Sequence, residues 1–332
     1  SDDDDADPPR LPPQVATRKS DRRASRYGLA GCDFRNMLRA GLPPVRFNVL
    51  HFLLNLPDVE DGEDVDFIEF FAGVGAVKKN MELRGWRAMA YDYVYDPVFN
   101  DILGTKGFLT AIQWLRRLRR HGAAHFATVC STWVWISRSS TKRSPCFPLG
   151  IEPRSETTQK ANTMVSRVSL LIAWLELTCR HWVLEQPGSS LMGLHPRMVD
   201  LHTLCGRANW HEVHTWMSMV GAPTAKSTRL WSSSRFVHQL HRKLTASRRA
   251  ELDSRGVSWR NQDGGSAGGP QLKETQEYPD GYGAAFATAF GKERSLLEAQ
   301  EPAADSDSEA NSDDIEEPTD LWEAAELAEL AG

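Results

Sequence analysis

The order of apolar and polar positions along the chain predicts alternating strands and helices. Buried strands are expected at 65–71, 88–91, 125–130, 182–185 and 211–220. Helices are expected at 76–84, 106–120 and 158–180, where apolar residues recur near helical spacing. This alternation builds a parallel sheet with helices on both faces. We therefore predict an α/β fold with a doubly wound, mainly parallel, Rossmann-like sheet.

The two ends of the chain differ in composition from its middle. We expect residues 1–32 to be a disordered arm, because they are acidic, then Pro-rich, then basic. Residues 33–63 resemble a helical lead-in with a linker, and 64–295 hold the folded domain, with a flexible Gly-rich loop at about 260–275. Residues 296–332 are expected to be an acidic, disordered tail. Apolar positions around Leu321 and Trp322 suggest a short helix for a protein partner.

Charge is distributed unevenly along the chain. The whole sequence carries a net charge of −5, but residues 298–332 hold thirteen acidic residues and residues 1–7 hold five. The remaining residues, 8–297, therefore carry a net charge of +13. A basic body of this kind suits a polyanionic partner, so nucleic acid, either DNA or RNA, is the expected partner. A generic solvated surface is the alternative.

Composition excludes several classes of protein. With 41% hydrophobic and 25% charged residues the chain has the make-up of a globular protein, and no apolar run is long enough for a membrane span. Five irregularly spaced cysteines indicate a reducing compartment and no disulfide framework. We expect an intracellular protein, and a nucleic-acid substrate would be consistent with the nucleus.

The most informative stretch runs from Asp66 to Gly75. An apolar strand ends there in the turn Ala72-Gly73-Val74-Gly75, and a helix follows. Glycines in such a turn let the backbone approach a ligand, and the helix N-terminus adds unpaired N–H groups. Structural glycines explain many such pairs. A second strand ends in Asp92, at the spacing where a carboxylate binds ribose hydroxyls, although helix capping is an alternative for it.

Several motifs in order resemble the cytosine-C5 DNA methyltransferases, within the S-adenosylmethionine-dependent methyltransferase superfamily. The sequence Glu69-Phe70-Phe71-Ala72-Gly73-Val74-Gly75 is similar to the family's first motif, and Asp101-Ile102 to its adenine-contacting dipeptide. Cys130 lies where the family has its nucleophile. Leu184-Glu185-Gln186-Pro187 resembles its Glu-Asn motif. Two later stretches complete the likeness, namely 221–231 and 282–287.

The resemblance implies a cofactor, S-adenosylmethionine, and a set of roles. Its cofactor-binding positions are Glu69, Phe71, Ala72, Gly73, Gly75, Asp92, Asp101 and Ile102. It implies that a Cys130 thiolate adds to cytosine C6, and that Glu185 acts as the general acid holding the base. A packed thiol and a surface ion pair are the structural alternatives for these two residues.

Basic residues supply the candidate contacts to the substrate. The hydroxyl-rich basic loop at 137–144 contains Arg138, Lys142 and Arg143, which we expect to contact a nucleic-acid backbone. Arg229 belongs to the later motif and is expected on the substrate side. A mobile surface loop is the alternative for the residues at 137–144.

The sequence also departs from the family. Val129 replaces the proline before the nucleophile, and little length remains for a domain that recognises a DNA sequence. An inactive binding module that keeps the fold, within a retroelement-like polyprotein, is therefore the alternative function. A dehydrogenase is disfavoured because Lys78 replaces the third glycine of its fingerprint. Zinc is disfavoured because His211 and His214 are expected on opposite faces of a strand, so no metal is expected.

Overall fold

The computed structural model describes residues 62–252, 258–260, 266–268 and 277–300. Expectations for residues 1–61, for most of the Gly-rich loop and for residues 301–332 lie outside this part of the chain. The elements, in chain order, are β1 (Val65–Phe70), α4 (Ala76–Glu82), β2 (Ala88–Tyr91), α5 (Thr105–Arg116), β3 (Leu118–Phe126), η1 (Trp135–Ser137), α6 (Arg138–Thr141), α7 (Glu156–Leu177), β4 (His181–Pro187), η2 (Met192–Leu194), α8 (Pro196–Cys205), β5 (His211–Trp216), η3 (Met217–Val220), β6 (Ser227–Ser232), η4 (Arg235–Leu240), α9 (Ala246–Leu252), β7 (Ser258–Arg260), β8 (Ser266–Gly268) and α11 (Asp280–Gln300).

A mainly parallel sheet forms the centre of the fold, as the sequence predicts. Its six strands lie in the order β2-β1-β3-β4-β6-β5, and β2, β1, β3 and β4 are parallel. Strand β6 runs antiparallel to both of its neighbours. The carboxyl ends of the four parallel strands therefore share one edge of the sheet, which is where ligands bind in open α/β sheets.

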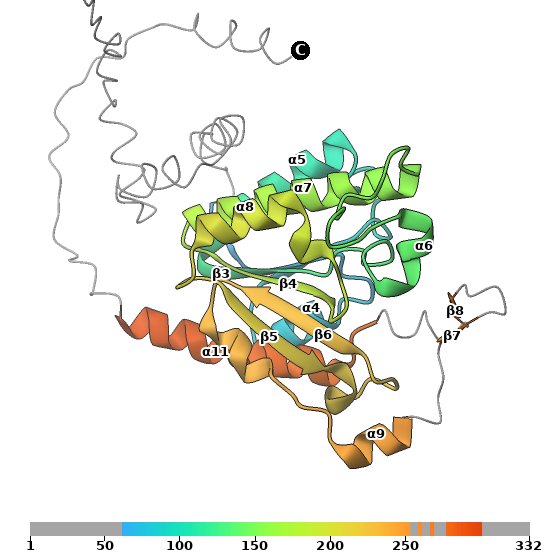
Figure 1. The fold of residues 1–332 in the computed structure, drawn as a ribbon. Coiled ribbons are helices and arrows are strands. Elements are labelled where there is room, and N and C mark those ends of the chain that lie inside the picture. Colours follow the sequence, from blue (N-terminus) through green and yellow to red (C-terminus); the bar gives the residue numbers. More distant parts are fainter. Residues whose placement is uncertain (1–61, 253–257, 261–265, 269–276, 301–332) are drawn as a thin grey trace, which may run out of the picture. The chain divides into compact units, whose positions relative to one another are not determined.

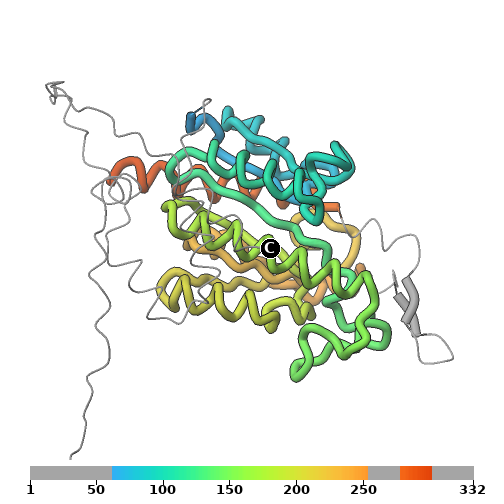
Figure 2. The backbone as a smooth tube through the Cα atoms, turned by 90° about the horizontal axis from the view of Figure 1, so that it is seen from above, coloured from blue at the N-terminus to red at the C-terminus, as the bar shows by residue number. Residues whose placement is uncertain are grey.

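Helices cover both faces of this sheet. Figure 1 shows α5, α7 and α8 on one face and α4 and α11 on the other. From above, in Figure 2, the helices of the first face lie in front of the strands. Two apolar clusters fill the layers, one with Ile68, Phe70 and Leu184, the other with Phe67, Val183 and Phe286. Alternate residues of each central strand are buried on opposite faces, because both faces are covered.

Three sequence-based predictions of elements were wrong in detail. Helix α5 ends at Arg116, and β3 spans Leu118–Phe126 instead of 125–130. The basic residues at 117–120 suit a helix surface, but here Arg117 and Arg119 pair with carboxylates at the start of β1. Strand β6 was missed because its buried positions include Thr228 and Ser232, so its apolar pattern is weak.

Two further boundaries also differ from the prediction. Helix α11 continues to Gln300, so residues 296–300 are helical and do not begin the expected tail. Within the expected Gly-rich loop, Ser266–Gly268 forms β8, which pairs antiparallel with β7. None of the helices in the described ranges is long and apolar enough to cross a membrane.

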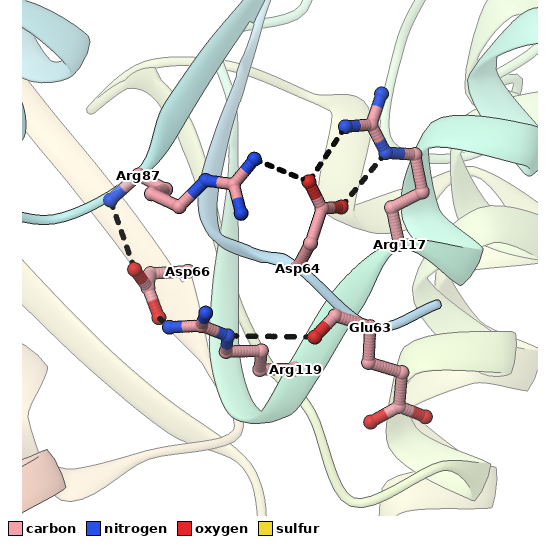
Figure 3. A network of polar contacts seen from close by, with 6 residues as sticks. All are labelled: Glu63, Asp64, Asp66, Arg87, Arg117 and Arg119. Atoms are coloured by element: carbon pink, nitrogen blue, oxygen red, sulfur yellow. Dashed lines mark hydrogen bonds and ion pairs between the residues drawn. The ribbon is translucent and has the colours of Figure 1, made fainter. Parts of the chain in front are cut away.

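An ion-pair network joins the elements at the amino edge of the sheet (Figure 3). Asp64 accepts hydrogen bonds from the guanidinium groups of Arg87 and Arg117. Asp66 is almost fully buried; it accepts a bond from the Arg87 N–H at 2.8 Å and one from Arg119 at 3.0 Å. It also pairs with Arg294 of α11, which is itself buried. This network fixes α11 and β3 to the start of β1.

We expect Asp66→Ala to destabilise the fold by about 3 kcal/mol. The substitution removes the buried carboxylate that pairs with the buried Arg294, and breaking a buried ion pair is strongly destabilising. The measurement is urea unfolding followed by circular dichroism. Lys160→Ala, which removes an exposed pair with Glu156 on α7, is the control and should leave the midpoint nearly unchanged. Equal effects of the two substitutions would contradict the structural role of Asp66.

Candidate active site

The glycine turn after β1 has an unusual backbone. Phe71, Gly73 and Gly75 all have positive φ, at 59°, 52° and 68°. A bulky residue such as Phe71 rarely adopts this conformation, and strain of this kind occurs often at ligand sites. A Cβ built on Gly73 would meet no atom within 4 Å, so this turn faces open space. The turn therefore has the conformation and the access that a bound ligand requires.

Glu69 lies directly beneath this turn. It is fully buried in β1, and its Oε2 accepts a hydrogen bond of 2.7 Å from the Lys78 N–H in the first turn of α4. Its Oε1 accepts no hydrogen bond from the described residues. Burial raises the pKa of Glu69 to about 7, although the backbone N–H groups of α4 oppose the shift. Glu69 thus accepts a hydrogen bond from the N-terminus of α4, and its carboxyl group keeps its proton up to a pH of about 7.

The raised pKa of Glu69 predicts how stability depends on pH. An acid whose pKa rises from 4.5 to about 7 on folding stabilises the fold below pH 4.5, and this contribution is lost as pH rises through 7. Glu69→Gln removes the titration. The stability of the variant relative to the wild type should therefore rise by about 3 kcal/mol between pH 4.5 and 7.5. Urea unfolding at several pH values measures it, and a pH-independent difference would refute the assignment.

Asp92 connects the end of β2 to the glycine turn. Its Oδ2 accepts a hydrogen bond from the Gly73 N–H at 2.9 Å, and its Oδ1 accepts one from the Val94 N–H at 2.9 Å. Tyr95, three residues on, donates its hydroxyl to the Gly73 carbonyl at 2.6 Å. Asp92 therefore shapes the turn, which is a role that the sequence alone did not predict. The position at the strand end is the one that the sequence predicted.

Asp101 and Ile102 lie just before α5, on the same connection between β2 and α5 that begins with Asp92. Asp101 Oδ1 accepts a hydrogen bond from the Leu103 N–H at 2.9 Å, and Ile102 is buried. Between β2 and Asp101 the chain exposes five apolar or aromatic side chains, each at least half accessible: Tyr93, Val94, Tyr95, Val98 and Phe99. This connection therefore combines carboxylates with accessible apolar surface.

Cys130 lies four residues beyond β3, on a connection that is tied to β4. The buried Gln186 of β4 donates hydrogen bonds to the carbonyl and the hydroxyl oxygen of Thr128, at 2.8 and 2.9 Å. The Cys130 side chain is partly buried. Burial and the nearby Glu185 carboxylate raise the pKa of the Cys130 thiol, and Lys226 opposes this effect. The structure therefore brings Cys130, Glu185 and Lys226 together.

Glu185 is buried in β4, and its Oε1 lies 3.4 Å from the Lys226 Nζ. Tyr278 also lies near Glu185. Burial raises the pKa of the Tyr278 phenol, and the Glu185 carboxylate raises it further. Glu185 Oε1 and the Tyr278 hydroxyl are both buried, so this carboxylate, the phenol and the Lys226 ammonium form one polar cluster. Sequence analysis missed Lys226 and Tyr278.

His125 continues this buried polar row across the sheet. It lies opposite Glu69 on β1 and Val183 on β4, and Glu185 is two residues further along β4 on the same face. Its Nε2 lies 3.1 Å from the Tyr282 hydroxyl, and burial lowers its pKa to about 3. The imidazole is therefore neutral at physiological pH. No sequence signal marked it, because it lies inside an apolar run.

The four basic candidates occupy different environments. Arg143 is buried against the Trp133 ring, and it donates hydrogen bonds to the Pro148 carbonyl and to Asn162, which favours a structural role over a phosphate contact. Arg229 lies 3.3 Å from Glu212 and binds the Gly188 carbonyl. Lys142 is exposed, and Arg138 is half-buried against Trp135. The loop that the sequence predicted at 137–144 is partly helical, because η1 ends at Ser137 and α6 spans Arg138–Thr141.

The histidines considered for zinc lie on or near β5. His211 pairs with Ser232 and His214 pairs with Arg229 in the register of β5 and β6. The two histidines are three residues apart on one strand, so they lie on opposite faces of the sheet. Within the described ranges no group of three or more metal-ligating side chains gathers.

No protein-family profile and no curated protein matches this sequence. The arrangement of the site therefore carries the functional argument.

Proposed function

We propose that this protein is an S-adenosylmethionine-dependent methyltransferase that acts on nucleic acid, with a cytosine as the base that its candidate nucleophile suits. One observation carries the proposal. Glu69, Asp92, Cys130 and Glu185 come from four consecutive parallel strands or the loops just after them, at one edge of the sheet. This is the edge where such folds bind ligands.

The residues at β1 and β2 fit the proposed cofactor. The open turn at Gly73 would accept its methionine part, and Asp92 would bind ribose hydroxyls with the lone pairs that remain on its oxygens. The exposed apolar side chains around Val98 and Phe99, with Asp101 beside them, suit an adenine ring and its amine. The cofactor, when bound, would supply an electrophilic methyl group.

The protein's own groups influence the thiol. Burial raises the pKa of the Cys130 thiol and the Glu185 carboxylate raises it further, while Lys226 opposes this effect. A proton shared between Glu185 and N3 of a cytosine would remove the repulsion by the carboxylate, so the thiol would lose its proton to solvent more readily. The thiolate would add to C6 while N3 takes the Glu185 proton, which makes C5 nucleophilic. After C5 accepts the methyl group, loss of the C5 proton to solvent and return of the N3 proton to Glu185 would break the C–S bond, restore the C5–C6 double bond and release the thiolate.

The net charge of the body supports nucleic acid as the substrate. Residues 8–297 carry a net charge of +13, which favours binding to a polyanion. Removing residues 301–332, which hold twelve acidic residues, should increase affinity for an oligonucleotide, because their negative charge lowers the attraction of the chain for a polyanion. Fluorescence anisotropy over a salt series measures this effect, and affinity should fall steeply with salt. Unchanged affinity on truncation would contradict the charge argument.

A second function, an inactive binding module with the same fold, is favoured by one observation. The resting Cys130 thiol has a raised pKa, while reactive cysteines have lowered values. Calorimetry with S-adenosylmethionine and S-adenosylhomocysteine separates the two functions. The proposed enzyme should bind both at micromolar concentration, in the common range for cosubstrates. Binding of neither compound would leave the module as the better account.

A further inference from the structure

Two tryptophan–arginine pairs lie close together just after Cys130, and they differ in exposure. Trp133 is 1% exposed, and the Arg143 guanidinium carbon lies 3.4 Å from its ring centre. Trp135 is 60% exposed, and the Arg138 guanidinium carbon lies 3.8 Å from its ring centre. The same pair chemistry is thus used once in the interior and once at the surface.

The buried pair fixes the segment that presents the exposed one. Arg143 donates hydrogen bonds to groups on both sides of the segment, including Asn162 of α7 at 2.9 Å. The Trp133 N–H donates to the Cys130 carbonyl at 2.9 Å, and the Trp133 carbonyl accepts from the Leu191 N–H at 2.9 Å. Trp135 begins η1 directly after this anchored turn. Its position is therefore preorganised, and preorganisation lowers the entropic cost of binding.

Trp135 presents a large aromatic surface to the solvent. The surroundings of Trp135 indicate the chemistry of a binding partner. Arg138 covers the ring with a cation, and the exposed Lys142 directly follows the short helix α6. Phe147, 55% exposed, belongs to the same connection between β3 and α7. From residue 129 to 154 this connection contains one acidic residue, Glu152, and four basic residues.

We propose that Trp135 and Arg138 form a stacking platform for an unpaired base, so that the substrate is single-stranded nucleic acid. Aromatic rings beside cations bind single strands because unpaired bases stack on the ring while the cations contact phosphates. A base in a duplex is already stacked and does not reach such a platform. The platform begins five residues after Cys130 in the sequence, on the same connection from β3 to α7. This inference rests on the proposed function for the identity of the substrate as nucleic acid.

The test measures binding of the full-length chain to fluorescein-labelled oligonucleotides by anisotropy, without cofactor. The probes are single-stranded DNA and RNA of mixed sequence and the corresponding DNA duplex. The wild type should bind a single strand more tightly than the duplex. Trp135→Ala should lower single-strand affinity about ten-fold with an unchanged salt slope, and Trp135→Phe should retain most of it. Lys142→Met should lower affinity and reduce the salt slope by about 0.7.

Leu109→Ala is the control, since this leucine of α5 is 53% exposed and outside the segment. Wild-type affinity in Trp135→Ala, equal losses for single strand and duplex, or no oligonucleotide binding by the wild type would each overturn the platform. Binding with no methyl transfer would refute the proposed function and leave the platform in place.

Discussion

Replacing Gly73 by aspartate should abolish binding of S-adenosylmethionine while the protein remains folded. Aspartate tolerates positive φ better than most residues, and a Cβ at this position meets no neighbour within 4 Å. The new carboxylate would occupy the space in front of the turn, close to Asp92, whose Oδ2 already binds the Gly73 N–H. We expect the Kd from calorimetry to rise roughly 100-fold or more, because an uncompensated charge costs several kcal/mol.

Gly85→Asp is the matched control for this experiment. Gly85 also has a positive φ, of 82°, and open space around its Cβ position, but it precedes β2 and lies at the opposite end of that strand from Asp92. The Gly85→Asp variant should bind S-adenosylmethionine with the same Kd as the wild type. Both variants should show cooperative thermal unfolding. Equal affinity of Gly73→Asp and wild type would remove the glycine turn from the site.

The second large effect concerns covalent chemistry at Cys130. An oligonucleotide that contains 5-fluorocytosine should form a stable adduct with the wild-type chain when S-adenosylmethionine is present. Fluorine at C5 cannot leave as a proton does, so the final elimination fails. Cys130→Ser should form no adduct, because a hydroxyl is a far weaker nucleophile than a thiolate. Denaturing electrophoresis and intact-mass spectrometry detect the product.

Two variants make this adduct experiment specific. Cys146→Ser removes an exposed thiol from the same connection between β3 and α7 and should leave the adduct intact. Glu185→Gln should slow adduct formation, because it removes the acid proposed to hold the base, but should spare cofactor binding. An adduct that survives in Cys130→Ser and is lost in Cys146→Ser would show that Cys146, and not Cys130, is the nucleophile.

Sequence pattern located the elements that position the site. The run from Val65 and the glycine turn predicted β1 and α4 because both hydrophobic periodicity and turn chemistry are local properties. The same is true of β2, which spans Ala88–Tyr91 as expected. Asp92 directly follows β2 as expected, whereas Cys130 lies four residues beyond β3 and Glu185 lies two residues before the end of β4. The parallel topology itself follows from the alternation of strands and helices.

Long-range pairing explains what the sequence could not show. Tyr278 and Lys226 are far from Glu185 in sequence, and only the folding of α11 and β6 onto β4 brings them near it. Arg143 resembled a substrate contact because it lies in a basic run, yet it is a buried anchor for Trp133. The basic start of β3 became a strand because Asp64 and Asp66 neutralise it. A pattern of residue types carries no information about such partners.

Transfer of a labelled methyl group tests the central claim most directly. The purified full-length chain is incubated with S-adenosylmethionine carrying a tritiated methyl group and with a cytosine-containing oligonucleotide, single-stranded or duplex, DNA or RNA. The proposed function predicts label in the oligonucleotide, more in the single strand than in the duplex, and none with Cys130→Ala. Absence of label from every oligonucleotide, from a chain that is folded and binds the cofactor, would contradict methyl transfer to nucleic acid.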